Sequence, residues 1–504
     1  MGQDSSLGQR VVVVGAGIGG LTAAALLARR GYAVRVFDQA QVAGGCASTF
    51  RRRGFTFDVG ATQVAGLEPG GIHHQLFADL DLPLPEATPC DPACAVFLPG
   101  ETKPIRVWRD PEAWQIERQR QFPGSEPFWQ LMQRLFQPSW RFQARQPVLP
   151  PRSPWDLVQL VQAVRPDTLL TVPYTFTTVG QVLKQLGLEG DRRLKTFLDL
   201  QLKLYSQVSA DETAVLYAAT ALSMSQAPQG LWHLHGSMQV LSDSLEKALV
   251  RDGGLLQLNH RVQQVHTASE KSADRVTGVS VENQKTGRTW VEPADHVVAN
   301  VTVQNLVQLL GDRAPQGYQR RVKALPPGSG AFVLYLGVKA AAIPAGCPPH
   351  LQFFYDYDGP IAENNTLFVS VSRSGDGRAP EGCATIVASS FTEIAPWWGN
   401  DYDSKKQAYT DGALKRLSGF FDLRDEHIVH VEAATPRTFA RFTARDRGSV
   451  GGLGMRISTF GPFGFASRTP VPGLWLVGDC THPGEGTAGV SYAAQTVVRQ
   501  IAAL

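Results

Sequence analysis

Hydrophobic positions follow their most regular pattern near the N-terminus, where an unbroken run of valines meets a glycine-rich turn. Val11–Val14 is wholly apolar, which is typical of a strand buried on both faces of a parallel sheet. After the turn, the stretch from Leu21 to Arg30 is rich in Ala and Leu and stops at Gly31, which predicts a helix. A second strand is expected from Tyr32 to Phe37. The order strand, turn, helix, strand predicts an α/β domain.

The turn itself has the glycine spacing of a dinucleotide-binding loop. Gly15 permits a tight turn, Gly17 leaves room for a pyrophosphate, and Gly20 lets the helix pack against the strand. Asp38 ends the second strand about 20 residues later, where an acid that binds ribose hydroxyls is expected. The alternative is a glycine-rich turn in another kind of α/β unit. A membrane span over residues 11–28 is disfavoured, because so many glycines destabilise a spanning helix.

Strand and helix patterns of the same kind return after residue 230. A helix is expected from His235 to Val250, one strand over residues 255–265, and a hairpin around Lys285. Further strands are expected over residues 331–337, 367–372 and 384–391.

Chain length and these changes of pattern predict interleaved domains. The chain has 504 residues, more than the roughly 250–300 at which single cores stop growing. We expect an α/β class, α+β overall, in which a Rossmann-like nucleotide-binding domain alternates along the chain with a substrate domain of mixed sheet and helices. The expected segments are 1–66, 231–300 and 441–504 for the nucleotide domain, and 67–230 and 301–440 for the substrate domain.

An amphipathic segment lies within the first part of the substrate domain. Apolar residues recur at helical spacing from Pro154 to Val164, and residues 169–176 continue the apolar character. Tryptophans and arginines flank the segment, as in helices that lie in a membrane interface. These flanking residues are Trp140, Arg141, Arg145, Arg152, Trp155 and Arg165. Packing of the same apolar face on the domain core is the other interpretation, and the sequence leaves both open.

The charge balance argues against nucleic acid as a partner. The chain carries 48 Lys and Arg against 45 Asp and Glu, a net charge of +3, which gives no basic footprint. Six cysteines are scattered along the chain and we identify no signal peptide, so reduced thiols in a cytoplasmic compartment are expected. Cys90 and Cys94 lack a second ligand pair nearby, which favours ordinary loop thiols over a metal site. No metal is expected.

Two stretches after Asp38 carry further candidate binding residues. Residues 42–53 combine paired glycines, a hydroxyl group and a basic cluster, which suits phosphate contact, although a solvated basic turn explains the same residues. The candidates are Gly44, Gly45, Ser48 and Arg52. The next stretch ends in Gly60 and Ala61, small residues that are expected where backbone approaches a flat ligand closely.

The C-terminal region repeats the pattern of strand, glycine-rich loop and helix. A hydrophobic strand ends at Gly478 and Asp479, and a helix of small residues begins near Thr487. A carboxylate at a strand end can bond a polyol hydroxyl. The N-terminus of the helix, which carries Gly489 and Val490, can stabilise negative charge on a reduced flavin ring.

Four motifs together resemble the flavin amine-oxidase superfamily. They are Gly15–Gly20, the Gly44–Gly45 turn, Phe57–Ala61 and residues 478–489. Within this superfamily the chain is similar, over essentially its whole length, to the phytoene-desaturase type of carotenoid desaturases and isomerases. The stretches GGCASTFRRRGFTFDVGATQ and HPGEGTAGVSYAA look most like the cyanobacterial-type carotenoid 3′,4′-desaturase.

The resemblance implies noncovalent FAD, with Val262 near the adenine, and a carotenoid taken from a membrane. It implies introduction of a C=C bond at C-3′,4′ by hydride transfer to flavin N5, and an electron acceptor that the sequence does not identify. Peripheral membrane association on the cytoplasmic side is expected. Two positions depart from the family: Asp38 stands where Glu is usual, and Cys46 stands where many relatives carry Arg or Ser.

His482 and Glu485 precede the predicted C-terminal helix and are our candidates for proton handling in catalysis. Shaping the loop by hydrogen bonds is the other interpretation of the two residues. We favour desaturation over cis–trans isomerisation by an enzyme that uses reduced FAD. A nicotinamide enzyme, a flavin amine oxidase with a polar substrate and a non-enzymatic carotenoid-binding protein are more distant alternatives.

Overall fold

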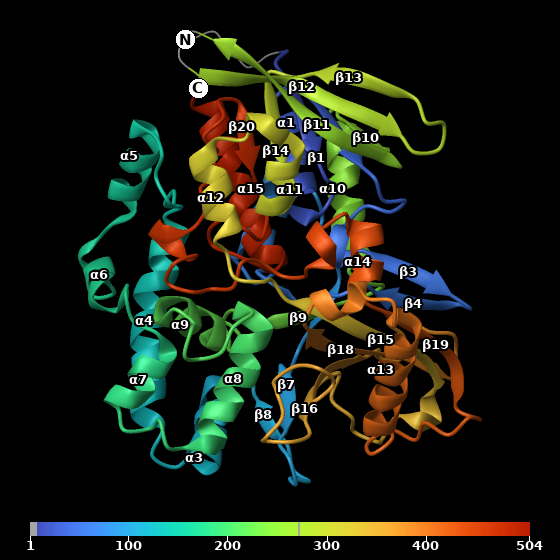
Figure 1. The fold of residues 1–504 in the computed structure, drawn as a ribbon. Coiled ribbons are helices and arrows are strands. Elements are labelled where there is room, and N and C mark those ends of the chain that lie inside the picture. Colours follow the sequence, from blue (N-terminus) through green and yellow to red (C-terminus); the bar gives the residue numbers. More distant parts are fainter. Residues whose placement is uncertain (1–7, 271–272) are drawn as a thin grey trace.

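The valine run forms β1 (Arg10–Val14), the central strand of a parallel sheet in the computed structural model, which describes residues 8–270 and 273–504 (Figure 1). The sheet has five strands in the order β10, β2, β1, β14, β20. The other four strands are β2 (Ala33–Asp38), β10 (Leu255–Leu258), β14 (His296–Ala299) and β20 (Leu474–Leu476). All neighbouring pairs are parallel, so the carboxyl ends of the strands meet along one edge.

Helices cover one face of the parallel sheet, and helices with a second sheet cover the other. Because side chains alternate along β1, Val11 and Val13 pack in one hydrophobic cluster and Val12 and Val14 in another. The first cluster includes α1 (Ile18–Arg29), α2 (Ile72–Asp79), α10 (Gln239–Arg251) and α15 (Thr487–Ala502). The second includes α11 (Val303–Leu310), α12 (Gln316–Lys323), β11 (His260–Glu270), β12 (Ala273–Asn283) and β13 (Thr289–Pro293). The predicted α/β class is confirmed.

The single strand expected over residues 255–265 is wrong. The backbone of Asn259 adopts a left-handed φ of 60°, which breaks the run into β10 and β11. As a result, β10 joins the parallel sheet, whereas β11 pairs antiparallel with β12 in a separate sheet. The hairpin expected around Lys285 is confirmed by the antiparallel pair of β12 and β13.

A second large sheet has seven strands in the order β19, β15, β18, β17, β16, β7, β8. In chain order these are β7 (Cys94–Phe97), β8 (Ile105–Val107), β15 (Gly330–Lys339), β16 (His350–Phe354), β17 (Thr366–Val371), β18 (Cys383–Thr392) and β19 (Ile428–Ala434). Three of them correspond to the strands expected at 331–337, 367–372 and 384–391. Residues of α13 (Tyr402–Leu417) and α14 (Pro436–Thr443) contribute to the two hydrophobic clusters of this sheet.

Helices make up most of residues 111–223 and form a third region beside both sheets (Figure 1). They are α3 (Pro111–Gln121), α4 (Glu126–Ala144), α5 (Pro154–Ala163), α6 (Pro166–Leu169), α7 (Val179–Gln185), α8 (Arg192–Ser206) and α9 (Val215–Ser223). The small sheets are β3 (Thr49–Arg52) with β4 (Phe55–Asp58), and β5 (Val64–Ala65), β9 (Leu231–Leu234) and β6 (Ala87–Pro89). The 3-10 helices are η1 (Gly45–Ala47), η2 (Val172–Tyr174), η3 (Gly311–Arg313), η4 (Ala340–Ala342), η5 (Ala395–Trp398), η6 (Asp446–Gly448) and η7 (Gly461–Phe463).

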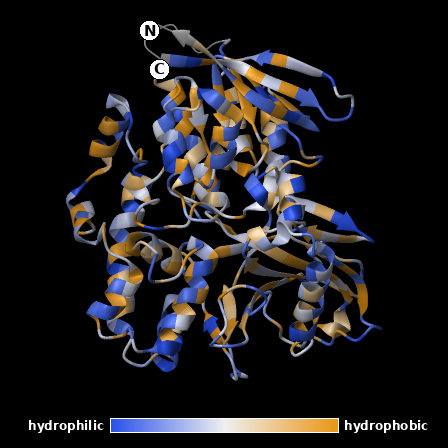
Figure 2. Ribbon diagram, viewed as in Figure 1, coloured by the Kyte–Doolittle hydropathy of each residue, from blue (hydrophilic) through white to orange (hydrophobic). Residues whose placement is uncertain are grey.

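The amphipathic segment forms α5, which lies at the outer edge of the helical region and carries hydrophobic positions along its length (Figure 2). Leu157 is 52% exposed and Val161 is 62% exposed, and Val158 between them is also exposed. The apolar face of α5 therefore does not pack on the domain core, and this interpretation is excluded for these residues. Within the described part of the chain, no helix combines the length and apolar character needed to cross a membrane.

Candidate functional site

The glycines of the first loop are packed so closely that side chains would not fit. Gly15 has a φ of 97°, and a Cβ atom on it would lie 2.7 Å from the carbonyl oxygen of Asn300. A Cβ on Gly17 would lie 2.7 Å from Oδ1 of Asn300, and one on Gly20 would lie 2.1 Å from the carbonyl oxygen of Gly15. Glycine is therefore favoured at each of the three positions, and only residues 15–17 separate the end of β1 from the start of α1.

Asn300 is the residue around which this loop is built, and the sequence motifs did not indicate it. Its backbone N–H donates to the carbonyl of Val14 at 2.8 Å, and its Nδ2 donates to the carbonyl of Val477 at 3.2 Å. It thereby ties together the carboxyl ends of β1, β14 and β20. A Cβ on Gly478 would lie only 2.8 Å from Nδ2 of Asn300. The sequence feature that could have indicated Asn300 is its position as a polar residue directly after the buried strand that ends at Ala299.

Asp38 is held directly under the first loop. Its Oδ2 accepts a hydrogen bond from the backbone N–H of Ala16 at 2.6 Å, and its Oδ1 accepts one from Ala40 at 2.7 Å. Burial raises the pKa of Asp38 above its ordinary value, against the effect of these two hydrogen bonds. Each carboxylate oxygen can accept more than one hydrogen bond, so the group remains able to accept from sugar hydroxyls.

The Gly44–Gly45 turn lies against the first loop. The N–H of Gly44 donates to the carbonyl of Ala16 at 2.8 Å, and both glycines have left-handed φ angles, 114° and 60°. The hydroxyl of Ser48 donates to the carbonyl of Gly45 at 2.7 Å and closes the turn. The N–H of Ala61 donates to the carbonyl of Cys46 at 3.3 Å, and a Cβ on Gly60 would lie 3.2 Å from the same oxygen. The five candidates Gly44, Gly45, Ser48, Gly60 and Ala61 are thus brought to one place.

The C-terminal helix reaches the same edge of the parallel sheet. A Cβ on Gly19 would lie 3.3 Å from the Cβ of Val490, so the first turns of α1 and α15 are in close contact. Gly489 also leaves little room for a side chain, because a Cβ atom there would lie 2.6 Å from the carbonyl oxygen of Gly484. Neither helix has a side chain that caps its N-terminus. Two sets of free backbone N–H groups therefore converge, an arrangement that stabilises negative charge.

Asp479 forms an ion pair that the sequence did not indicate. Nη1 of Arg445 lies 2.9 Å from Oδ2 of Asp479, and both side chains are only 17% exposed. The guanidinium also donates to the carbonyls of Ser449, at 2.8 Å, and Gly451. Although burial acts in the opposite direction, the carboxylate of Asp479 raises the pKa of Arg445 above its ordinary value. A fixed positive charge therefore lies beside Asp479, and the Cys46 thiol lies within its field.

Glu485 is a strongly perturbed acid in the loop before α15. Its Oε2 accepts a hydrogen bond from Nε2 of Gln207 at 2.9 Å, whereas its Oε1 is buried without a partner among the described residues. Burial and the negative charge of Asp479 raise the pKa of Glu485 to about 8. The carboxyl group therefore holds a proton at neutral pH and can donate it.

His482 has the opposite character. Burial lowers the pKa of His482 to about 4, so the imidazole is neutral at physiological pH. Its Nε2 is hydrogen-bonded to the side-chain amide of Gln143 at 2.8 Å, and its ring lies 5.8 Å from Phe460 and 6.2 Å from Tyr492 between centroids. A neutral, hydrogen-bonded and enclosed imidazole favours the interpretation that His482 shapes the loop.

Two predicted residues lie away from the glycine loops. Arg52 is exposed on β3, where its Nε forms an ion pair with Glu432 at 3.1 Å, so the structure does not bring it to the phosphate candidates. Val262 lies on β11 in the cluster that also contains Val14 and Phe37, beside the first βαβ unit.

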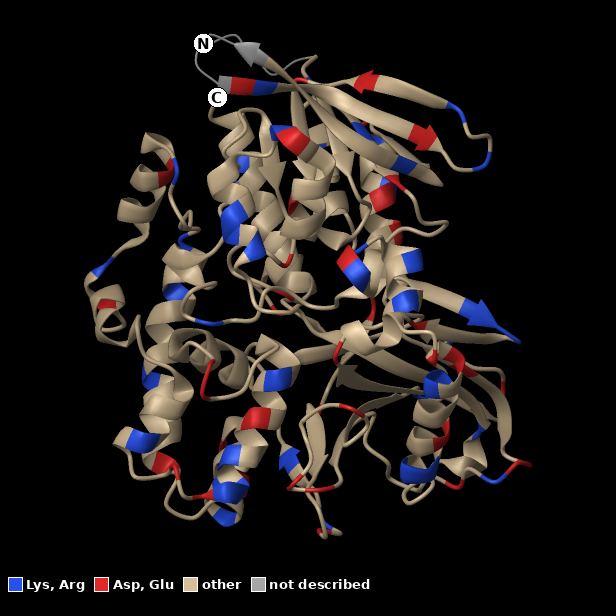
Figure 3. Ribbon diagram, viewed as in Figure 1, with Lys and Arg blue, Asp and Glu red and all other residues tan. Residues whose placement is uncertain are grey.

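A dinucleotide fits the chemistry of this edge. The close-packed glycines bring together the N-termini of two helices whose N-cap residues, Gly17 and Gly486, have no side chain, and backbone N–H groups at helix N-termini suit a pyrophosphate. Two carboxylates, Asp38 and Asp479, can accept from sugar and polyol hydroxyls at either end. Elsewhere, acidic and basic residues are interspersed along the ribbon (Figure 3).

Comparison with known proteins places these features in context. A family model described as an NAD(P)-binding Rossmann-like domain matches residues 13–80. Prolycopene isomerase 1, chloroplastic, of an Oncidium hybrid cultivar is 27% identical, over 98% of this chain and 83% of its own. The zeta-carotene-forming phytoene desaturase of Myxococcus xanthus is 26% identical, over 99% and 94% of the two chains. The 4,4'-diapolycopene oxygenase of a Methylomonas species is 26% identical, over 99% of both chains.

Solved structures of oxidoreductases share the fold. An oxidoreductase from Methanosarcina mazei superimposes with a TM-score of 0.62 at 17% identity, covering 97% of this chain and 100% of its own. Cyclohexylamine oxidase from Brevibacterium oxydans superimposes with a TM-score of 0.61 at 16% identity, covering 98% and 99%. The resemblance to carotenoid desaturases and isomerases, and the prediction of an oxidoreductase, are confirmed by the sequence relatives. The solved structures show the shared fold.

Replacing Glu485 by Gln should change how stability depends on pH. Because the folded-state pKa of about 8 lies above that of an unfolded glutamic acid, the contribution of Glu485 to stability is fully present below about pH 4.3. This contribution is lost as the pH rises from about 4.3 through 8, and the free energy of unfolding falls by up to about 1.4 kcal/mol per pH unit in that interval. The melting temperature of Glu485→Gln relative to that of the unmodified protein should therefore increase from pH 5 to pH 9. The exposed Glu381→Gln serves as the control, and parallel profiles for all three proteins would contradict the assignment.

Proposed function

We propose that the protein is an FAD-dependent oxidoreductase that acts on a carotenoid. The observation that carries the proposal is the convergence of the uncapped N-termini of α1 and α15, with a carboxylate beside each, at one edge of the parallel sheet. Similarity over nearly the whole chain to enzymes named for prolycopene, zeta-carotene and diapolycopene supports the substrate class.

The residues at this edge can be assigned to successive parts of an FAD molecule. The first loop, with Gly15, Gly17 and Gly20, and the N–H groups of α1 would hold the diphosphate. Asp38 would accept from the ribose hydroxyls, and Val262 would contact the adenine. The remaining contacts would come from Gly44, Gly45, Ser48, Gly60, Ala61, Gly478, Asp479, Gly489 and Val490. A bound FAD supplies two-electron redox chemistry that amino-acid side chains lack.

Arg445 completes the charge balance of the proposed FAD site. Cys46 leaves the Gly44–Gly45 turn without a cation, and Arg52 is engaged with Glu432. The guanidinium of Arg445, ion-paired with Asp479, comes from a distant part of the chain and lies close enough to affect the thiol of Cys46. Because Asp479 balances its charge, Arg445 would offer a diphosphate next to the second glycine turn hydrogen-bond donors of its planar guanidinium rather than a net positive charge.

Glu485 is the better of the two candidates for proton handling. Its carboxyl group exchanges a proton near pH 8, close to physiological pH, which is the condition for efficient general acid or base catalysis. His482, with a pKa of about 4, is a weak base at the same pH and is held by Gln143. Gln207 orients the carboxyl group of Glu485 through Oε2 and leaves Oε1 unpartnered.

The reaction proposed is desaturation, with a C=C bond introduced at C-3′,4′ and two electrons passed to an acceptor. Removing hydrogen from an allylic position requires a carbon-bound proton to leave, and the carboxylate form of Glu485, whose population grows as the pH approaches 8, would accept that proton. The second candidate is cis–trans isomerisation, which the prolycopene isomerase relatives favour. It causes no net loss of electrons, so the two reactions differ in the mass of the product.

Incubation of the FAD-loaded protein with an acyclic or monocyclic carotenoid in liposomes should distinguish the two reactions. Desaturation gives a product that is lighter by two hydrogens and has a red-shifted absorption spectrum, because the conjugated chain is longer. An isomer of unchanged mass that forms only after reduction of the flavin would establish the isomerase instead. Turnover of a polar amine in a parallel assay, with no change in the carotenoid, would overturn the substrate class.

Peripheral membrane binding through residues 157–176 forms the second part of the proposal. Eight large hydrophobic side chains of this segment are exposed. They are Leu157, Val158, Val161, Val164, Leu169, Leu170, Val172 and Phe176. We refer to this set as the apolar patch. Exposed hydrophobic residues are normally scattered singly over a protein surface, whereas these eight follow one another within one short segment. Such a patch suits insertion at the boundary of lipid headgroups and acyl chains.

Substituting Leu157 and Val161 together by Ser should weaken membrane binding. Each buried aliphatic side chain contributes about 1.5–3 kcal/mol, so the double variant should bind neutral phosphatidylcholine vesicles at least tenfold more weakly in a flotation assay. A matched control replaces Val250 and Leu255, which are exposed on another part of the fold, by Ser. Equal flotation of both double variants would remove the apolar patch from the proposal.

A further inference from the structure

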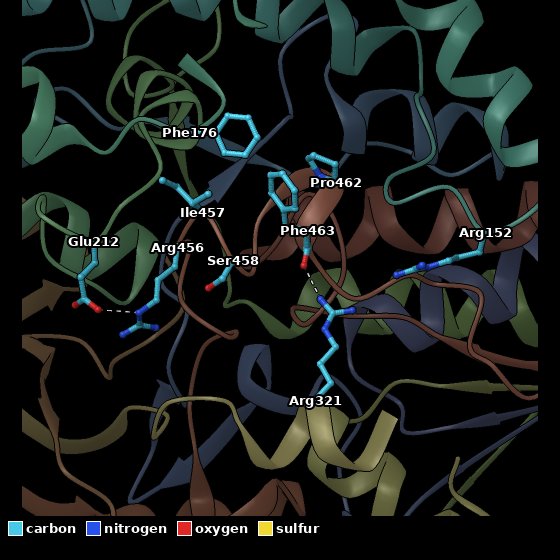
Figure 4. A pocket seen from close by; sticks show the side chains of 9 residues that line it. All are labelled: Arg152, Phe176, Glu212, Arg321, Arg456, Ile457, Ser458, Pro462 and Phe463. Carbon is cyan, nitrogen blue, oxygen red and sulfur yellow. Dashed lines mark hydrogen bonds and ion pairs between the residues drawn. The ribbon is translucent and has the colours of Figure 1, made fainter. Parts of the chain in front are cut away.

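A surface cavity of about 750 Å³ adjoins the apolar patch (Figure 4). Phe176 of the patch forms part of its wall and contacts Phe463 of η7, with 5.5 Å between ring centroids. Both rings are exposed, Phe176 by 68% and Phe463 by 37%. A membrane that receives the apolar patch would therefore also cover the mouth of this cavity.

Three arginines line the same cavity. Arg152 enters from the loop before α5, Arg321 from α12, and Arg456 from the C-terminal region, and the guanidinium groups of Arg152 and Arg321 point toward one another in Figure 4. Glu212 is the one carboxylate among the lining residues of this cavity. Its Oε1 lies 2.8 Å from Nε of Arg456, so it neutralises that arginine. Two positive charges remain uncompensated.

The acids of α5 and α6 are engaged with other arginines. Asp156 of α5 is buried and ion-paired with Arg468 at 3.3 Å, and Asp167 of α6 is ion-paired with Arg145 at 2.9 Å. The guanidinium of Arg321 donates to backbone carbonyls, including that of Gly464 at 2.8 Å. The side chain of Arg152 has no hydrogen-bond or ion-pair partner among the described residues.

The two uncompensated arginines also repel each other. Burial and the positive charge of Arg152 lower the pKa of Arg321 below its ordinary value. The guanidinium of Arg321 is held in place over the ring of Phe465, with its central carbon 4.0 Å from the ring centroid. A fixed guanidinium beside a free one is a geometry that phosphate groups satisfy by bidentate hydrogen bonds.

We propose that this cavity binds the phosphate of an anionic lipid headgroup, so that the protein docks preferentially on anionic membranes. The inference rests on the proposed membrane binding of the apolar patch and adds to it a choice of lipid. The apolar rim of Phe176 and Phe463 faces the acyl chains, and Arg152 with Arg321 meets the headgroup charge. The patch supplies affinity for any bilayer, and the cavity supplies selectivity among bilayers.

Flotation of the full-length protein on two kinds of vesicle tests the inference. Vesicles of phosphatidylcholine alone are compared with vesicles of phosphatidylcholine and phosphatidylglycerol. The protein should bind the anionic vesicles more tightly. Arg152→Gln should reduce binding to anionic vesicles about fivefold and leave binding to neutral vesicles unchanged, because one cation near an anionic surface contributes about that factor. Lys285→Gln, which removes the same charge from an exposed loop elsewhere, should change neither.

A charge-conserving variant separates a built site from diffuse attraction. Arg152→Lys keeps the charge but loses the planar fork of donors, so it should recover only part of the anionic preference. Full recovery by Lys would show that diffuse charge is sufficient and would overturn the phosphate site. Saturable binding of inorganic phosphate without vesicles would assign the cavity to a free ligand and would also overturn it.

The flotation assay also distinguishes the proposal of headgroup selectivity from the proposal of membrane docking. Equal binding of the unmodified protein to both kinds of vesicle would refute headgroup selectivity and leave membrane docking intact. Absence of binding to either kind would refute membrane docking itself.

Discussion

The structure depends on the close approach of backbone segments at one edge of the parallel sheet. Asn300 leaves no room for a Cβ atom at Gly15, Gly17 or Gly478, and Gly19 meets Val490 across the same junction. Because these glycines leave room for the close contacts, segments from the two ends of the chain can lie together, and the first turns of α1 and α15 meet. The candidate cofactor contacts other than Arg52 and Val262 are arranged around this junction.

Electrostatics at the junction follow from that packing. The two helix N-termini favour negative charge, and Asp38 and Asp479 lie beside them. Arg445 compensates Asp479, while Glu485 in the same group keeps its proton because burial and Asp479 both oppose its ionisation. The site thus combines anion-binding backbone groups, one fixed cation and one carboxyl group that titrates near physiological pH.

The local parts of this arrangement could be predicted from sequence, and the long-range parts could not. The valine strand, the glycine spacing and Asp38 lie within one βαβ unit, where spacing determines geometry. Arg445 and Asn300 act through contacts with residues far away in the chain, and no short motif encodes those contacts. The ion pair of Arg52 with Glu432 of β19 is a contact of the same long-range kind.

The periodicity of hydrophobic residues also predicts structure incompletely, as α5, β10 and β11 show. Apolar residues at helical spacing predicted α5, but the same pattern suits a core helix and an interfacial helix, and only the exposure of Leu157 and Val161 separates them. Alternation predicted β10 and β11 as one strand, because a left-handed turn at Asn259 leaves the alternation of side chains undisturbed in the sequence.

If the junction of α1 and α15 forms an FAD site, equilibrium titrations of the purified chain should distinguish FAD from FMN. FAD should bind at one molecule per chain with a perturbed flavin absorption spectrum. FMN should bind far more weakly, because it lacks the adenosine phosphate that the first loop and Asp38 are placed to hold. Gly17→Val should abolish FAD binding. Equal affinity for FAD and FMN, or an unperturbed flavin spectrum at saturating FAD, would contradict the account.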